Sequence, residues 1–363
     1  MFALPRLLVC SLFALGLTHS SVSLAANRFA DPLDTPARQT VRSLQSPIWA
    51  LASAGGERVI GVGPRGHILL SDDRGQSWRQ VASPVSVDLT AVQFPTSTEG
   101  WIVGFDGVVL HSTDAGASWT RVLDGREIGA LMVAHYDKVA DVRSDPELQK
   151  ALEDAHIFVE DGPIRPFFDV WFRNAREGWL VGQFNLILHT SDGGRTWQPW
   201  LDRTENPEQY SLHAIQGVGD DVYIVGELGL VLKLTPDGSR FSRVVTPYAG
   251  TWFNVFGSAS EVYAVGLRGS VWRSSNGGET WGQVTTEVAE GMNAGSSLPD
   301  GRALVLAQTG RLLSGTSAGQ TLEEVKAPGL SENGFDLLVL SSTELLVSGR
   351  RGVSRVLLSE TRK

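Results

Sequence analysis

The stretch WLVGQFNLILHTSDGGRTW, residues 179–197, contains two motifs that together decide the fold. Its first half holds two short apolar runs joined by a glycine-containing turn, the pattern of two adjacent strands. Its second half, TSDGGRTW (190–197), fits the Asp-box pattern S/T-x-D-x-G-x-S/T-W. The aspartate can accept hydrogen bonds from N–H groups of its own turn, and glycine accepts a positive φ. The box is therefore expected to close a hairpin onto a third strand.

Both motifs recur along the chain at a nearly constant interval. Aligned on the second glycine of the turn, the copies are spaced by 41, 78, 44, 40, 41 and 42 residues, with reference positions Gly63, Gly104, Gly182, Gly226, Gly266, Ala307 and Gly349. Five steps near 40 and one nearly doubled describe seven copies and one insertion. A period near 40 residues made of short strands is typical of a β-propeller blade. We predict an all-β fold, a seven-bladed β-propeller of four-stranded blades.

The first copy, GVGPRG (61–66), also fits the dinucleotide-binding pattern G-x-G-x-x-G. That pattern has its meaning only between a strand and a helix. Here the short aliphatic run HILLS follows, and turn-forming residues close it. We therefore interpret these glycines as the turn between two strands of the first blade.

Four copies carry a complete or nearly complete Asp-box, and two others carry worn versions at 234–241 and 315–322. We expect each box aspartate to order its turn and each box tryptophan to bury its ring between neighbouring blades. The role of the box is structural and gives no support for catalysis. The paired positions are Asp73 and Trp78, Asp114 and Trp119, Asp192 and Trp197, and Asn276 and Trp281.

The last copy ends at Lys363 before a fourth strand can form. The segment ARQTVRSL (37–44) resembles a strand and precedes the first blade. We predict that it completes the seventh blade, because a ring with an unpaired edge strand would be open to edge-to-edge association.

The doubled step contains an insertion of about residues 126–166, between the second and third blades. Ser144, Asp145, Pro146 and Glu147 form a capping box, and LQKALEDA (148–155) has helical spacing, so one short helix is expected. Connections between blades emerge at the same face as the glycine turns, which places the insertion there. A tolerated loop insertion and a functional loop both fit this pattern.

Residues 1–25 have the features of a secretory signal peptide. Arg6 precedes an apolar run at 7–17, and cleavage is expected after Ala25. Cys10 is the only cysteine, and bulky Val9 before it disfavours a lipoprotein signal, so the mature chain (26–363, one propeller) has no disulfide. Loss of Arg6 changes the formal net charge from −9 to −10, which disfavours a general binder of nucleic acid or anionic membranes. We expect a periplasmic monomer without membrane insertion.

Arginines gather in the glycine turns on the face that carries the insertion. On an acidic protein, they suggest a docking surface for a carboxylate-bearing partner. The alternative is that turns are exposed and exposed residues are often charged. The residues concerned are Arg65, Arg268, Arg350 and Arg351 in the turns, and Arg165 at the end of the insertion.

No catalytic or cofactor site is supported by the sequence. GTSAG (315–319) fits the nucleophile pattern G-x-S-x-G, but it is the worn Asp-box of the sixth copy. His111 and His189 occupy the same repeat position, and no metal-binding motif appears. The arginine pattern of sialidases is missing, and Tyr223 and Tyr263 hold a packing position of the repeat. A carboxylate pair is not decided by sequence, so a carbohydrate-active propeller, binding or hydrolysing a glycan in its central depression, stays the alternative.

The combination W-x-V-G-x-x-G with S/T-x-D-G-G-x-T/S-W resembles the photosystem II stability/assembly factor family over nearly the whole mature chain. RPFFDVWF (165–172) and residues 248–274 are similar to its branch in non-photosynthetic Gram-negative bacteria, often associated with RND-type exporters. The resemblance implies a non-enzymatic, exported scaffold or accessory factor that binds an envelope membrane protein complex, such as an RND-type exporter, in part through an arginine patch. Only Arg65, Arg268 and Arg351, with Arg350 adjacent, match that patch. The second, third, fourth and sixth blades lack the arginine.

Overall fold

The computed structural model of this protein describes residues 30–139, 144–259, 261–315, 319–327, 330 and 333–358. Asp31–Lys363 forms one compact unit. The predicted signal peptide with its cleavage site at Ala25, and Ser317 of the GTSAG motif, lie outside the described residues. No helix in the described part of the chain is long and apolar enough to cross a membrane.

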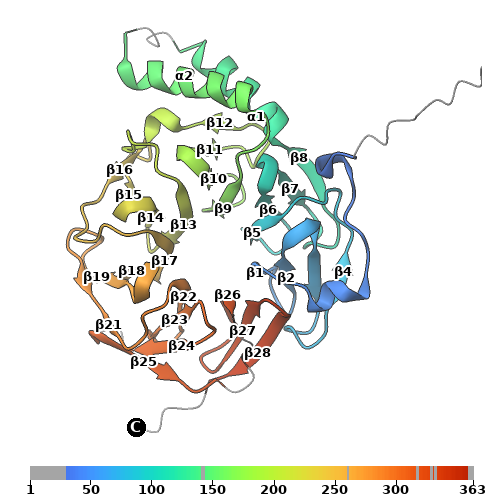
Figure 1. Cartoon of the computed structure of the whole chain (residues 1–363), viewed down its shortest axis with the longest axis vertical. Coiled ribbons are helices and arrows are strands. Elements are labelled where there is room, and N and C mark those ends of the chain that lie inside the picture. The colour runs from blue at the N-terminus through green and yellow to red at the C-terminus, as the bar shows by residue number, and fades with distance from the viewer. Residues whose placement is uncertain are drawn as a thin grey trace, which may run out of the picture. The chain divides into compact units, whose positions relative to one another are not determined.

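The unit from Asp31 onward is a ring of seven sheets whose strands are almost all antiparallel, which confirms the predicted β-propeller (Figure 1). Strands follow one another in chain order from the centre of the ring outward. The first three blades are β1 (Ala50–Ser53), β2 (Val59–Val62), β3 (Ile68–Ser71), β4 (Arg79–Val81); β5 (Leu89–Gln93), β6 (Gly100–Gly104), β7 (Val109–Ser112), β8 (Thr120–Leu123); and β9 (Phe167–Phe172), β10 (Gly178–Gly182), β11 (Ile187–Thr190), β12 (Gln198–Pro199).

The next three blades repeat this order, and the sixth gains a short outer strand, β21 (Thr285–Thr286), parallel to β25. Their strands are β13 (Leu212–Val218), β14 (Asp221–Gly226), β15 (Val231–Leu234), β16 (Phe241–Arg243); β17 (Trp252–Ser258), β18 (Glu261–Gly266), β19 (Val271–Ser274), β20 (Gly282–Gln283); and β22 (Met292–Ser297), β23 (Ala303–Ala307), β24 (Leu312–Gly315), β25 (Thr321–Val325).

The second strand of each blade is the most buried. β6, β10 and β23 are buried along their whole length, because each blade packs against a neighbour on both faces. The hydrophobic clusters consequently lie between blades. One of them joins Trp101 of the second blade to Phe172 and Trp197 of the third. These contacts hold the ring together and leave the turns at both ends of the blades free for other roles.

The predicted strand at 37–44 is wrong. The seventh blade has three strands in the described part of the chain, β26 (Gly334–Val339), β27 (Glu344–Gly349) and β28 (Gly352–Leu357), and Val41–Gln45 forms a 3-10 helix, η2. The segment bonds to β4 of the first blade, where Gln39 donates to the Val81 carbonyl, and η2 also contacts β28 of the seventh blade without pairing as a strand. Val41 is 86% exposed, so its apolar side chain finds no buried face that would fix a strand register.

The insertion contains two helices where one was predicted. α1 (Gly125–Tyr136) and α2 (Pro146–Asp161) pack on each other beside β12, outside the ring (Figure 1). The cap of α2 is Asp145, whose carboxylate accepts from the N–H groups of Glu147 and Leu148, so Ser144 is not the capping residue. As predicted, the insertion begins and ends at the face of the glycine turns: a Cβ on Gly107 of one such turn would lie 2.9 Å from the Cα of Gly125.

Candidate functional site

The turns between the second and third strands share one conformation in five blades. Each is a short 3-10 turn whose middle residue has a left-handed φ between 49° and 57°, a region that is unfavourable for residues other than glycine. The turns are η3 (Pro64–Gly66), η4 (Phe105–Gly107), η5 (Gln183–Asn185), η7 (Glu227–Gly229) and η8 (Leu267–Gly269), with middle residues Arg65, Asp106, Phe184, Leu228 and Arg268. The middle side chain is mostly exposed, so the turn presents it to solvent at some conformational cost.

Four of the predicted arginines occupy these turns. Arg65 and Arg268 are middle residues, and Arg350 with Arg351 forms the two-residue turn between β27 and β28. All four are exposed, and within the described residues none of them forms an ion pair. The turns of Arg65 and Arg350–Arg351 belong to adjacent blades, the first and the seventh. Arg268, in the fifth blade, is separated from Arg350–Arg351 by the sixth.

Arg165 has a different environment. Its side chain is 11% exposed, and its guanidinium lies 2.7 Å from the Asp161 carboxylate. The same group lies over the rings of Phe158, at 4.6 Å, and Phe184, at 5.4 Å. Arg165 therefore fastens α2 to the turn of the third blade.

Large apolar side chains share this face with the arginines. Phe105, Phe184, Leu228 and Leu267 are between 41% and 57% exposed, on the turns of the second to fifth blades. Sequence reasoning missed them, although Phe184 and Leu228, in turn positions that favour Gly, Asn or Asp, were a visible signal. We call the turns 64–66, 105–107, 183–185, 227–229, 267–269 and 350–351 together the docking face.

The central channel opens at the start of the inner strands, on the same side as the docking face. An extra residue interrupts the pairing of the first and second strands in the second to seventh blades. Its identity alternates between polar and aromatic around the ring: Thr90, Phe168, His213, Phe253, Asn293 and Phe335. Each polar member bonds to a carbonyl of the following blade, those of Phe167, Trp252 and Gly334, at 2.8 Å.

Two carboxylates line the channel, which has a volume of about 410 Å³. Asp169 accepts from the Ile215 N–H of the following blade at 2.8 Å, and Asp336 accepts from the Leu51 N–H, also at 2.8 Å, which joins the seventh blade to the first. Burial raises the pKa of Asp169 to about 7, with a further contribution from the charge of Asp336, whose own pKa burial raises to about 6. Both groups therefore serve as links between neighbouring blades.

The Asp-boxes lie at the opposite end of the strands. Asp192 accepts from the Thr196 N–H at 2.9 Å and from its hydroxyl at 2.6 Å, and these bonds lower the pKa of Asp192 to about 2. Asp73 and Asp114 make the equivalent bonds. Asn276 also accepts from the Thr280 N–H, but its amide donates to the Thr280 hydroxyl. The box glycine packs on the preceding blade: a Cβ on Gly194 would lie 2.1 Å from Trp101. Trp119 and Trp197 are buried, whereas Trp78 and Trp281 are half-buried.

The repeat histidines serve packing. The ring of His111 stacks on Trp101 with centroids 4.1 Å apart, and that of His189 lies 4.9 Å from Trp179. Burial lowers the pKa of His189 to about 4, so it is neutral at physiological pH. Among the described residues, no group of three or more His, Cys, Asp or Glu side chains could hold a metal ion.

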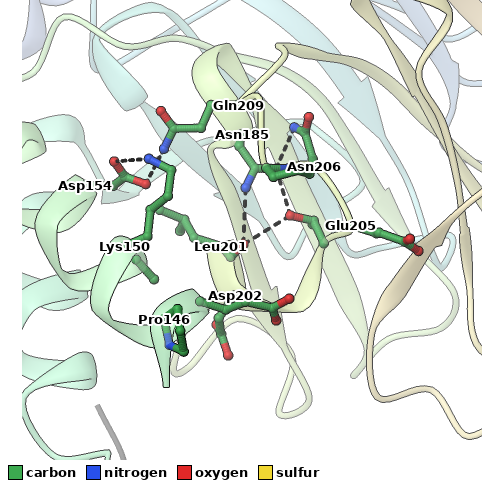
Figure 2. A pocket seen from close by; sticks show the side chains of 13 residues that line it. Pro146, Lys150, Asp154, Asn185, Leu201, Asp202, Glu205, Asn206 and Gln209 are labelled. Carbon is green, nitrogen blue, oxygen red and sulfur yellow. Dashed lines mark hydrogen bonds and ion pairs between the residues drawn. The ribbon is translucent and has the colours of Figure 1, made fainter. Parts of the chain in front are cut away.

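A second hollow lies between α2 and the connection from β12 to β13, and it meets the docking face at Asn185. Figure 2 shows this cavity of about 240 Å³, with Lys150 and Asp154 of α2 on one side and the segment 201–209 on the other. We call it the insertion pocket. Its lining residues are Pro146, Glu147, Lys150, Ala151, Asp154, Asn185, Leu201, Asp202, Thr204, Glu205, Asn206, Pro207 and Gln209.

Comparisons with known proteins agree with the repeat. The profile of the family described as "Photosynthesis system II assembly factor YCF48" matches residues 49–130 and 160–325. Photosystem II assembly lipoprotein Ycf48 from Synechococcus sp. (strain CC9902) is 30% identical over 128 residues, which are 33% of this chain and 37% of that protein. Photosystem II stability/assembly factor HCF136, chloroplastic, from Arabidopsis thaliana is 24% identical over 289 residues, 69% of this chain and 71% of that protein.

Solved structures show the same fold. A structure described as YCF48 bound to D1 peptide matches with a TM-score of 0.61 and 16% identity, over 90% of this chain and 97% of that chain. YCF48 from Cyanidioschyzon merolae also matches with a TM-score of 0.61, at 14% identity, over 86% of this chain and 96% of that chain.

Proposed function

The chain belongs to the photosynthesis system II assembly factor YCF48 family, whose propellers are assembly factors and not enzymes, and from this premise we propose that it binds an exposed segment of a membrane protein through its docking face. The D1 peptide bound to a solved YCF48 supports a polypeptide partner. The role proposed is that of a scaffold during assembly of an envelope membrane complex, with an RND-type exporter as one candidate partner.

The observation that carries this proposal is the set of four exposed arginines without an ion-pair partner in the described residues. A guanidinium that is not already paired can form two parallel hydrogen bonds to a carboxylate. Leu267 precedes Arg268 in the same turn, and Leu228 lies on the turn of the adjacent fourth blade, so both offer apolar contact area beside this charge. Exposed apolar side chains next to unpaired arginines are typical of protein interfaces. Arg165 is held by Asp161, so we assign it to the support of this face and not to partner binding.

Export to the periplasm is part of the same proposal. It is supported by the sequence features of residues 1–25, with cleavage after Ala25. Intact-mass measurement of protein purified from a periplasmic extract tests it, and a mature chain beginning at Ala26 is expected. A full-length mass in the cytoplasmic fraction would contradict it.

The docking role is tested by affinity capture of the tagged protein from detergent-solubilised membranes. The variant Arg350→Glu/Arg351→Glu is compared with Arg176→Glu/Arg195→Glu, which changes the same charge at two exposed arginines on the opposite face. We expect one membrane protein to be recovered with wild type and with the control variant. Its recovery should fall at least tenfold with the Arg350/Arg351 variant, and further when Arg65 and Arg268 are also reversed. Equal recovery with both variants would remove the docking face from the proposal.

Aromatic residues at the channel mouth favour a second candidate, the binding of a glycan. Phe168, Phe253 and Phe335 are half-buried at the start of their inner strands, and Trp49 precedes the first inner strand. Aromatic rings can stack on the apolar faces of sugars. A glycan array probed with wild type and a Phe168→Ala/Phe253→Ala variant tests this candidate, and the absence of any bound glycan would reject it.

A further inference from the structure

The insertion pocket meets the docking face at Asn185 of the turn 183–185, and one of its walls lies outside the family match. The family profile leaves residues 131–159 unmatched, and this segment supplies the α2 wall of the pocket, including Lys150 and Asp154. The assembly-factor function of the family therefore does not account for the cavity. The other wall, the segment 201–209, belongs to the matched part of the ring.

The side-chain amides that line the pocket, those of Asn185, Asn206 and Gln209, already donate hydrogen bonds within the protein. The Asn185 amide donates to the Leu201 carbonyl at 3.2 Å, and the Asn206 amide donates to the Asn185 side chain at 3.0 Å. The Thr204 hydroxyl also donates to the Asn185 side chain, at 2.9 Å. The Gln209 amide donates to the Asp154 carboxylate (Figure 2). The pocket thus has few donors left for a ligand, whereas oxygen acceptors keep unused lone pairs.

Carboxylates outnumber cations around the cavity. Asp154 is 8% exposed, and its nearest cation is Lys150, 3.4 Å away and about half exposed. Asp202 is oriented by the Tyr136 hydroxyl, which donates to it at 2.9 Å. Glu147 and Glu205 complete the acidic lining, and Lys150 is its only basic residue.

Three arginines lie outside this lining and contact its acidic residues. The guanidinium of Arg240 approaches Glu147 at 3.8 Å and that of Arg203 approaches Asp202 at 4.0 Å, whereas Arg243 donates to Glu205 from its backbone N–H. None of the three engages Asp154. Among the lining residues, Lys150 is the cation that pairs with the buried Asp154 carboxylate, and the charge of Arg165 acts on this carboxylate from outside the lining. A half-exposed lysine can swing away from its carboxylate.

We propose that the insertion pocket binds a guanidinium group carried on a short aliphatic chain, with Asp154 as its principal partner. Guanidinium has five N–H donors in one plane, which suits a cavity rich in acceptors. Pro146, Ala151, Leu201 and Pro207 provide an apolar wall for the chain. A volume of about 240 Å³ is below that of pockets for drug-sized ligands, so the ligand is small or is a single side chain. Lys150 occupies the carboxylate in the free protein and leaves it when the ligand enters.

Isothermal titration of the full chain with agmatine tests the proposal, with succinate as an anionic probe. Wild type should bind agmatine and not succinate. Asp154→Asn should weaken agmatine binding at least tenfold, because the buried charge is lost. Lys150→Met should tighten it several-fold, because the competing internal cation is removed; a pocket that recognises carboxylates through Lys150 would show the opposite.

A matched control separates this effect from general charge. Glu323→Gln removes an exposed carboxylate of β25, remote from the pocket, and should bind agmatine as wild type does. A peptide with one arginine between glycines distinguishes a protein side chain from a free small molecule: binding of both probes shows that a partner's arginine can enter, and binding of agmatine alone points to a metabolite. No agmatine binding by wild type, equal binding by Asp154→Asn, or preference for succinate would overturn the proposal.

Discussion

Single residues in turns determine which end of this ring is a scaffold and which is available for recognition. At one end, the Asp-box aspartates accept several hydrogen bonds inside one turn, as Asp192 does from Thr196. At the other end, the middle residues of the 3-10 turns take a left-handed conformation although they are not glycine. Leu228 is 57% exposed there, so burial does not explain its choice, whereas the ring of Phe184 lies under the Arg165 guanidinium. Strain of this kind in an exposed turn supports a binding role.

The Asp-box makes a prediction for stability. Replacing Asp192 by Ala leaves the turn without its acceptor and should lower the free energy of unfolding by about 1 kcal/mol, measured by urea denaturation at pH 7. Asp192→Asn should have a smaller effect, because Asn276 fills the same position and still accepts from the Thr280 N–H.

The pH dependence of the unfolding free energy tests the same role of the Asp192 carboxylate. The pKa of Asp192 is lowered to about 2 in the folded state. The carboxylate therefore stabilises the fold at any pH above its pKa in the unfolded chain, and this stabilisation is lost as pH falls from about 4 to 2. Asp192→Asn should remove that part of the acid dependence. An unchanged acid transition in this variant would contradict the role of the carboxylate.

At the scale of elements, the insertion is an integral part of the core and not a loose loop. Ile128, Met132 and Tyr136 of α1 and Ala155 and Phe158 of α2 are buried in one cluster with residues of the second and third blades. The helices also carry one wall of the insertion pocket. The position of that wall consequently depends on how firmly α2 packs on the ring.

This packing can be tested at Phe158, which is 2% exposed and lies under Arg165. Phe158→Ala should lower the free energy of unfolding by about 3 kcal/mol or release α2 locally, because a large buried ring is lost. Ile157→Ala, at a neighbouring position that is 46% exposed, is the control and should change stability by less than about 0.5 kcal/mol. Urea denaturation and hydrogen exchange of α2 measure the two effects. Equal values for both variants would mean that α2 does not depend on this contact.

At the scale of the whole ring, closure depends on links between inner strands. Asp336 of the last blade accepts from Leu51 of the first, and Asp169 makes the equivalent bond to Ile215. Side chains of Thr90, His213 and Asn293 make further links at other junctions. The seventh blade needs no strand from the N-terminal segment, since its packing on β1 and the bond to Leu51 join the two ends of the ring.

The raised pKa of Asp169 predicts how stability responds to pH. The folded state binds its proton more tightly than the unfolded state, so this group favours folding most at low pH, and the contribution declines as pH rises from about 4 to 7. Asp169→Asn should remove the decline. The difference in unfolding free energy between wild type and variant, measured from pH 4 to 8, isolates it from the buried His189, whose lowered pKa has the opposite effect. A difference that does not vary with pH would contradict the assignment.

The sequence by itself determined the seven blades, the Asp-box turns, the place of the insertion and the exposure of the turn arginines. These features depend on local rules, namely strand alternation, turn chemistry and a repeat near 40 residues, which are visible along one chain. The first helix of the insertion was missed although Ile128, Met132 and Tyr136 have helical spacing. Its start signal was also present in the sequence, because Asp124 caps the helix by accepting from the Arg126 N–H.

Tertiary structure alone decided three features: the conformation of residues 37–44, the ion pair of Arg165 and the insertion pocket. The sequence of segment 37–44 is compatible with a strand. In the structure its end forms a 3-10 helix, because Gln39 bonds to β4 and Val41 finds no buried face. In the sequence, Arg165 stands at the end of the insertion and was expected to join the turn arginines. In the structure it holds α2 in place through Asp161 and Phe158. The pocket joins residues about fifty positions apart, such as Asp154 and Gln209. No local pattern encodes such a contact, since it arises from how two separate segments pack on the ring.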